Sequence, residues 1–163
     1  MSVAIRDALP SDAEAICAIY NPHVRDTIVT FEEVAITVDE MSGRIATISA
    51  ILPWLVAERD GDVVGYAYAA CFIDRSGYRF CAVSTIYIDE TAHRAGIGKS
   101  LYSALLDRLR EKSIHSVVGI IALPNPASIA LHEKCGFRKA GHLAEAGFKF
   151  GRWIDVGYWQ VLL

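Results

Sequence analysis

The spacing of apolar residues predicts both helices and strands in this chain. Leu101, Leu105 and Leu109 repeat every four residues within the segment 99–112, which predicts a helix with one buried face. Residues 117–123 form a short, almost wholly apolar run, which is typical of a strand buried on both faces.

Two helix-start signals follow a first strand at residues 3–7. Ser11 and Glu14 have the spacing of a capping box, and we expect that helix to run to about Tyr20, where Asn21-Pro22 ends it. Thr37 and Glu40 form a second capping box, which opens a helix that ends before Pro53.

Strands dominate the rest of the pattern. Asp60-Gly61 is a turn dipeptide between two β-type runs, 54–58 and 62–72, and predicts an antiparallel hairpin. The remaining expected elements are a strand at 79–88, a helix at 125–135 closed by Gly136, and strands at 138–143 and 153–161. This order predicts a mixed α/β fold that contains a strand–helix–strand crossover.

Composition narrows the class of protein. The chain has 163 residues, of which 53% are hydrophobic and 21% charged, so we expect a single domain over residues 1–163 and no intrinsic disorder. The net charge of -3 and the lack of a basic run argue against a nucleic-acid partner. No apolar run approaches the roughly 20 residues that span a bilayer, and charges near the start argue against a secretion signal. We therefore expect a cytoplasmic protein without a membrane partner.

The four cysteines offer no metal or redox motif. Cys17, Cys71, Cys81 and Cys135 lie far apart, and none stands two residues from another. We interpret them as small buried apolar residues and expect no metal.

The segment 84–98 carries the clearest chemical signal. A β-branched strand leads into a loop whose Gly96 and Gly98 stand at the start of the strongest predicted helix. The first amide groups of a helix have no partner within it, and glycines let an anion come close to them. The loop is neither a Walker loop nor a complete dinucleotide-binding fingerprint, so it predicts a phosphate site of another kind.

Several motifs in one order carry a family resemblance. The loop reads His93-x-x-Gly96-x-Gly98, and the other matching stretches are Ile19-Tyr20-Asn21, residues 54–58, 65–68, 86–88, 123–125, 131–137, 147–153 and 159–160. Together they resemble the GNAT superfamily of acetyl-CoA-dependent N-acetyltransferases, in the branch of the phosphinothricin and methionine sulfoximine acetyltransferases. The loop departs from the family pattern, because His93 stands where glutamine or arginine is usual.

The resemblance implies a GNAT-like acyl-CoA N-acyltransferase fold with a mostly antiparallel sheet, and acetyl-CoA as cosubstrate without a metal. The backbone of Ile86, Tyr87 and Ile88 would pair with the pantetheine arm, and Asn125, which also suits a helix N-cap, would touch the cofactor. The pyrophosphate would be cradled by Arg94, Ala95, Gly96, Ile97, Gly98 and Lys99.

The resemblance also implies residues that act on the acyl group and on a small-molecule amine of amino-acid type. Tyr102 matches a tyrosine that protonates the departing thiolate, although it also suits a packed aromatic residue. The residues that match substrate-pocket positions are Phe31, Arg75, Tyr78, Thr85 and His132. Relatives of this branch pair, so we expect a homodimer.

One position departs from the family in a way that bears on catalysis. Val83 stands where the family carries a glutamate taken as the general base, and valine cannot accept a proton. His132 or Asp74 as a substitute base, a slow enzyme, and an amine that is already neutral all stay open. Two other functions stay open as well: a GNAT enzyme for another amine, and a catalytically silent acyl-CoA-binding protein.

Overall fold

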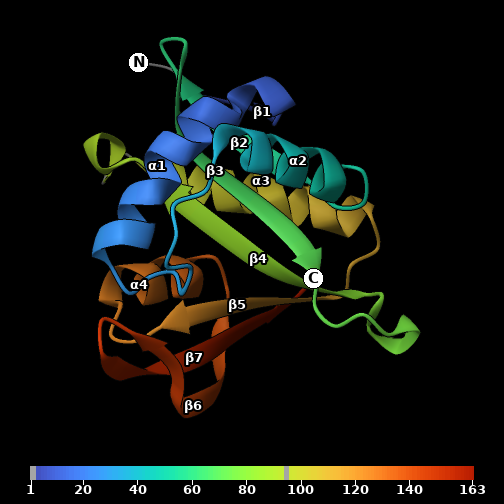
Figure 1. Ribbon diagram of the computed structural model, residues 1–163. Helices are drawn as coiled ribbons and strands as arrows, with labels where there is room; N and C mark the ends of the chain where they lie inside the picture. The colour runs from blue at the N-terminus through green and yellow to red at the C-terminus, as the bar shows by residue number, and fades with distance from the viewer. Residues whose placement is uncertain (1–2, 94–95) are drawn as a thin grey trace.

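The computed structural model describes residues 3–93 and 96–163. Within these residues the strands form one seven-stranded sheet in the order β1-β2-β3-β4-β5-β7-β6 (Figure 1). Neighbouring strands are antiparallel except β4 and β5, which are parallel. The strands are β1 (Val3–Asp7), β2 (Trp54–Arg59), β3 (Asp62–Cys71), β4 (Cys81–Ile88), β5 (Ser116–Ala122), β6 (Arg138–Lys149) and β7 (Arg152–Leu162).

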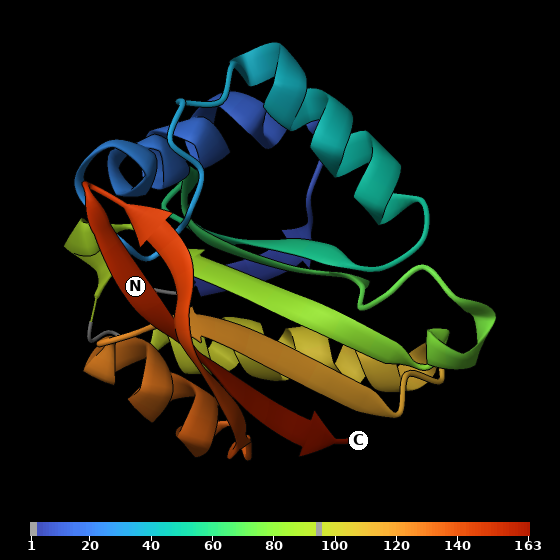
Figure 2. The ribbon, with the colours of Figure 1, turned by 60° about the horizontal axis from the view of Figure 1, so that its bottom comes forward.

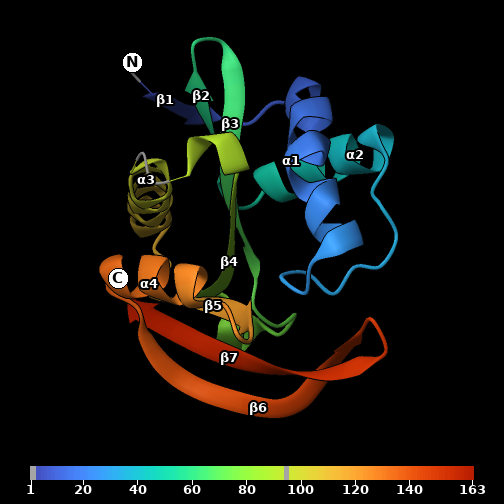
Figure 3. The same ribbon diagram turned by 90° about the vertical axis from the view of Figure 1, so that its left-hand side faces the viewer.

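Helices cover both faces of the sheet. Helices α1 (Ala13–Asp26) and α2 (Val38–Ser49) lie on one face, and α3 (Ile97–Glu111) and α4 (Pro126–Lys134) lie on the other, as Figures 2 and 3 show. Short 3₁₀ turns span Pro10–Asp12, Ser76–Tyr78 and Glu90–Ala92. The mixed α/β class and the mostly antiparallel sheet with helical flanks are confirmed.

Each face of the sheet has its own apolar core. Leu101, Leu105 and Leu109 of α3 are fully buried against the sheet, because residues four apart share one side of a helix. On the opposite face, Ile16 of α1 and Ile45 of α2 are equally buried. Both faces of the central strands are therefore covered.

Several local predictions are confirmed. Thr37 and Glu40 form the expected capping box, since the Glu40 amide donates to Thr37 Oγ1 (3.2 Å) and the Thr37 amide donates to Glu40 Oε2 (2.9 Å). The hairpin turn at Asp60 and Gly61 has positive φ at both residues, 55° and 94°. The crossover is β4–α3–β5, which joins the parallel pair.

The predicted boundaries of α1 are wrong. The helix continues through Pro22 to Asp26, because Val24 is buried in the core and the Asn21 side chain binds Ile36 instead of ending the helix. The expected Ser11–Glu14 capping box is absent at the start of α1. The Asp12 carboxylate instead accepts from the Leu9 amide and from Arg6, which fixes a 3₁₀ turn.

Three further expectations are corrected. β6 extends to Lys149 rather than Leu143, because residues 147–149 resume pairing with β7 after a register shift. β5 is not buried along its whole length, because Ile120 lines a cleft and is 46% exposed. Among the cysteines, Cys71 is exposed at the end of β3, whereas Cys17 is buried.

No helix among the described residues is long and apolar enough to cross a membrane.

Candidate active site

The parallel strands β4 and β5 part in the middle of the sheet. Their described pairing runs from Cys81 and Ser116 to Ser84 and Gly119, where it ends. Beyond that point a cleft of about 770 Å³ opens between them, lined by residues 84–88 of β4 and by Ile120, Ile121 and Ala122 of β5. One edge of β4 pairs with β3 here, so its other edge faces the cleft and offers backbone groups to an extended ligand.

The start of α3 forms one end of this cleft. Gly96 is the N-cap with φ 75°, a left-handed conformation that glycine adopts without strain, and no side chain caps the helix. The amides of Ile97, Gly98 and Lys99 belong to the first turn and have no partner within the helix, so they suit an anion. Gly96, Ile97, Gly98 and Lys99 all line the cleft, as expected. Arg94 and Ala95 lie outside the described residues.

The loop before α3 is fastened to the end of β4. The His93 imidazole lies 3.0 Å from the Ile88 carbonyl through Nε2, which donates in this contact. His93 thus holds the loop against the strand whose backbone lines the cleft, a role that its departure from the family pattern did not reveal.

Asn125 is the N-cap of α4 and also lies on the wall of the cleft. Its side-chain oxygen accepts from the Ser128 amide (3.1 Å) and so caps α4. It also lines the cleft, and its amide nitrogen is not used by the cap.

Tyr102 lies behind the wall of the cleft. Its ring is fully buried, its hydroxyl lies 2.5 Å from Ser84 Oγ, and Ser84 itself lines the cleft. Ser84 also donates to the Val118 carbonyl (3.4 Å), so the shared hydrogen bond is one that Tyr102 donates. Burial raises the pKa of Tyr102, which keeps the phenol protonated. Sequence reasoning missed Ser84, whose serine in an otherwise apolar and β-branched strand was the available signal.

His132 lines the same cleft from α4. Its Nδ1 donates to the Ser128 carbonyl (2.7 Å), which leaves the lone pair on Nε2. Burial lowers the pKa of His132, and the hydrogen bond to Ser128 only partly opposes this. The ring occupies the space beside Gly119, where an added β-carbon would lie 2.5 Å from Nε2. His132 is therefore a neutral imidazole in a fixed orientation.

The opposite face of β4 carries Val83, Thr85 and Tyr87, because side chains alternate along a strand and Ser84 faces α3. Thr85 lines the cleft and pairs across the sheet with Tyr68. Val83 is half-buried and offers no proton acceptor.

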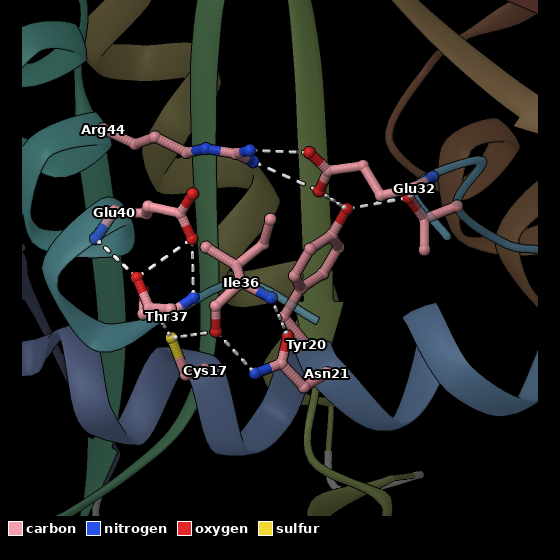
Figure 4. Close-up of polar contacts among 9 residues, drawn as sticks. Cys17, Tyr20, Asn21, Glu32, Ile36, Thr37, Glu40 and Arg44 are labelled. Atoms are coloured by element: carbon pink, nitrogen blue, oxygen red, sulfur yellow. Dashed lines mark hydrogen bonds and ion pairs between the residues drawn. The ribbon is translucent and has the colours of Figure 1, made fainter. Parts of the chain in front are cut away.

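A polar cluster lies over this face, between α1, α2 and the segment that joins them (Figure 4). Glu32 accepts hydrogen bonds from Tyr20 and from both terminal nitrogens of Arg44, at 3.2 and 2.6 Å. Burial raises the pKa of Glu32, but the hydrogen bonds from Arg44 and Tyr20 outweigh it, so the pKa is below its usual value. These partners lie 12 residues apart in sequence, so no local pattern indicated the cluster.

The remaining predicted substrate residues do not line the cleft. Phe31 lies in the segment between α1 and α2 and is 39% exposed, close in sequence to Val29, which does line the cleft. Arg75 and Tyr78 lie on the exposed connection between β3 and β4, as does Asp74. Among the described residues, the structure therefore brings the predicted cofactor residues together with His132, while Arg75 and Tyr78 do not line the cleft.

The part of the chain that the structure describes contains no cluster of three or more histidine, cysteine, aspartate or glutamate side chains that could hold a metal ion.

Known proteins resemble this chain over almost its whole length. Residues 5–157 match the acetyltransferase (GNAT) domain family. The chain belongs to the GNAT acetyltransferase family. The resemblance inferred from the motifs is thus confirmed.

Two curated relatives and one solved structure illustrate the similarity. Phosphinothricin N-acetyltransferase of Streptomyces viridochromogenes is 39% identical over 158 residues, which are 97% of this chain and 86% of that protein. L-Methionine sulfoximine/L-methionine sulfone acetyltransferase of Pseudomonas paraeruginosa is 34% identical and spans 100% of this chain and 96% of its own. The crystal structure of a phosphinothricin acetyltransferase from Sinorhizobium meliloti in complex with acetyl-CoA has a TM-score of 0.95 at 38% identity, over 100% of this chain and 89% of that one.

Proposed function

We propose that this GNAT chain transfers an acetyl group from acetyl-CoA to the primary amine of a small amino-acid-like molecule of the phosphinothricin or methionine sulfoximine type. The observation that carries the proposal is the cleft between β4 and β5, which ends at the uncapped start of α3. The relatives named above support the substrate class, because they are acetyltransferases of such molecules.

The residues of the cleft fit acetyl-CoA. The free edge of β4 at Ile86, Tyr87 and Ile88 suits the amide groups of a pantetheine arm, and the first-turn amides of α3 suit a pyrophosphate. Lys99 adds a positive charge at that end, and Asn125 adds a side-chain amide on the opposite wall. When bound, acetyl-CoA supplies a thioester whose acetyl carbon accepts the amine nitrogen by direct attack, with release of the thiol.

Two groups transfer protons in this proposal. His132 is neutral and has the lone pair of its ring on Nε2, so it is a group on the cleft wall that can accept the proton of the attacking amine. Tyr102 donates to Ser84. When the Ser84 hydroxyl turns from the Val118 carbonyl to the cleft, it gives its proton to the leaving sulfur while the Tyr102 proton moves to Ser84. Phe31, Thr85, Arg75 and Tyr78 are proposed to contact the amine substrate, the last two from the connection between β3 and β4.

Turnover with a panel of amines tests the proposed function. Acetyl-CoA consumption should be fastest with phosphinothricin, methionine sulfoximine and related α-amino acids, and slow with polyamines and peptide N-termini. Preference for a polyamine or a peptide would indicate a GNAT enzyme for another amine. Tight binding of acetyl-CoA without turnover of any amine would indicate a silent acyl-CoA-binding protein and overturn the proposal.

Replacing Tyr102 with phenylalanine should lower kcat about tenfold, which is less than the roughly 10²- to 10⁴-fold that general acids typically contribute, because a thiolate is a weakly basic leaving group. The ring keeps its packing, so acetyl-CoA affinity should change less than twofold. Ser84→Ala should have the same effect, since it removes the link to the cleft. Steady-state kinetics and calorimetry measure both quantities, and an unchanged kcat in Tyr102→Phe would assign Tyr102 to packing alone.

The proposed enzyme is a cytoplasmic homodimer. Leu143, Phe148 and Trp153 on β6 and β7 are about half exposed or more, and an apolar surface of this kind suits burial against a second copy. The four cysteines are free thiols, which suits a reducing compartment. A monomeric mass in light scattering at micromolar concentration would contradict the dimer.

A further inference from the structure

A buried lysine joins the end of β6 to the segment between α1 and α2. The Lys149 side chain is 1% exposed, and its Nζ donates to the carbonyls of Thr30 (2.8 Å) and His23 (3.4 Å). A buried ammonium group is costly unless its donors are used, so these two carbonyls are the reason that it is tolerated there. Figures 2 and 3 both show the tip of the β6–β7 hairpin next to this segment.

The His23 carbonyl lies in the last turn of α1, at the negative end of the helix dipole. It also accepts from the Thr27 amide (3.2 Å) and from Thr27 Oγ1 (2.9 Å). Lys149 thus brings a positive charge to the negative end of the helix dipole, and it fixes the point at which the chain leaves α1.

A second contact lies two residues earlier on β6. The ring of Phe31 covers Gly147 so closely that a β-carbon there would lie 2.2 Å from Phe31 Cζ. Gly147 and Lys149 share one face of the strand, and Thr30 and Phe31 are neighbours in the chain. Two adjacent residues of the segment are therefore held by two residues of a single strand face.

The position of this segment matters for the cleft. Val29 lines it, and Phe31 is a proposed substrate contact. We propose that Lys149 and Gly147 are positioning residues, which hold Phe31 at the amine side of the cleft and so determine the size of the amino-acid side chain that is admitted. This inference rests on the proposed function, in which Phe31 contacts the amine.

The attachment of residues 27–33 through Lys149, called the anchor below, is tested first and without any substrate. Hydrogen–deuterium exchange of the amides in residues 27–33 should be about tenfold faster in Lys149→Met, because the segment loses its attachment. Lys149→Arg keeps a charged donor and should exchange more slowly than Lys149→Met. The matched control is Lys139→Met, which removes an exposed lysine from the same strand and should leave exchange unchanged. Equal exchange in Lys149→Met and the unmodified protein overturns the anchor.

Substitutions at Gly147 and Phe31, made singly and together, test whether this contact determines the size of the substrate side chain that is admitted. Gly147→Ala forces the Phe31 ring away from β6, so KM should rise at least fivefold for amino acids with long side chains and less for alanine, with unchanged affinity for acetyl-CoA. In a Phe31→Leu background the overlap is absent, so Gly147→Ala should leave KM for long side chains close to that of Phe31→Leu alone, which a general loss of structure would not allow. Equal effects on long and short amines, or no relief in the double variant, overturn the inference. Failure of the unmodified protein to acetylate any amine overturns the proposed function instead.

Discussion

Replacing Gly98 with leucine should raise the Kd for acetyl-CoA about 100-fold. A β-carbon at Gly98 would lie 3.3 Å from the Leu131 side chain and 3.7 Å from that of Ile88, and both side chains line the cleft, so we expect a leucine here to crowd the cleft at the first turn of α3. Loss of two charge-assisted hydrogen bonds to a pyrophosphate costs about 3 kcal/mol, which corresponds to that change in Kd. Isothermal titration calorimetry with acetyl-CoA measures it directly.

The matched control is Gly43→Leu, because Gly43 lies on the exposed side of α2 with no atom near its added β-carbon. Both changes place leucine inside a helix, where it is favoured over glycine, so neither should unfold the protein. Replacing Gly96 with a β-branched residue tests the same loop by another route, since its φ of 75° disfavours any side chain. Unchanged Kd in Gly98→Leu would remove the phosphate site from the start of α3.

The sequence predicted those parts of the fold that local chemistry determines. The Thr37–Glu40 capping box and the positive φ at Asp60-Gly61 involve residues within one turn of each other, so their pattern was sufficient. The extent of α1 depends instead on contacts from distant segments, such as the bonds between Asn21 and Ile36. Proline's local preference is therefore outweighed by packing that no window of sequence contains.

The candidate site likewise has one end that local sequence specifies and another that depends on distant contacts. The phosphate-binding end is local, because two glycines and a helix start specify it. The amine side is assembled from separate segments: Glu32 with Arg44, Phe31 with Gly147, and Lys149 with Thr30. A lysine between two phenylalanines, as at Lys149, is unusual and can be seen in the sequence. The carbonyl that it binds, that of Thr30, lies 119 residues away and cannot be predicted locally.

The exposure of Ile120 and Cys71 shows a related limit. An apolar run predicts burial, yet Ile120 faces the cleft because β5 is no longer paired with β4 beyond Gly119. Where strands part to admit a ligand, apolar residues line a cleft rather than a core. A departure from predicted burial thus marked the site itself.

The missing base determines how the rate should depend on pH. Without a proton acceptor, kcat/KM should climb about tenfold per pH unit until the pKa of the amine, because only the neutral amine attacks. If His132 accepts the proton, the rate should instead level off above the pKa of the imidazole. Burial lowers that pKa, so the levelling should begin below the ordinary value of about 6.5, and His132→Gln should restore the climb.

Val83→Glu should raise kcat/KM at pH 7 about 100-fold in a protein that lacks a base, at the low end of the range for general base catalysis. The alternation of β4 directs the new carboxylate to the α1–α2 side, between Ala70 and Val118 of the neighbouring strands. These apolar neighbours raise the pKa of a carboxyl group, which makes it a better acceptor as long as it stays ionised at pH 7. Val83→Gln has the same shape without the basic oxygen, so it is the control for changes in packing. A rate gain shared by Val83→Glu and Val83→Gln would show that the substitution acts through shape. No gain in Val83→Glu, together with a level pH profile in the unmodified protein, would assign the proton to His132.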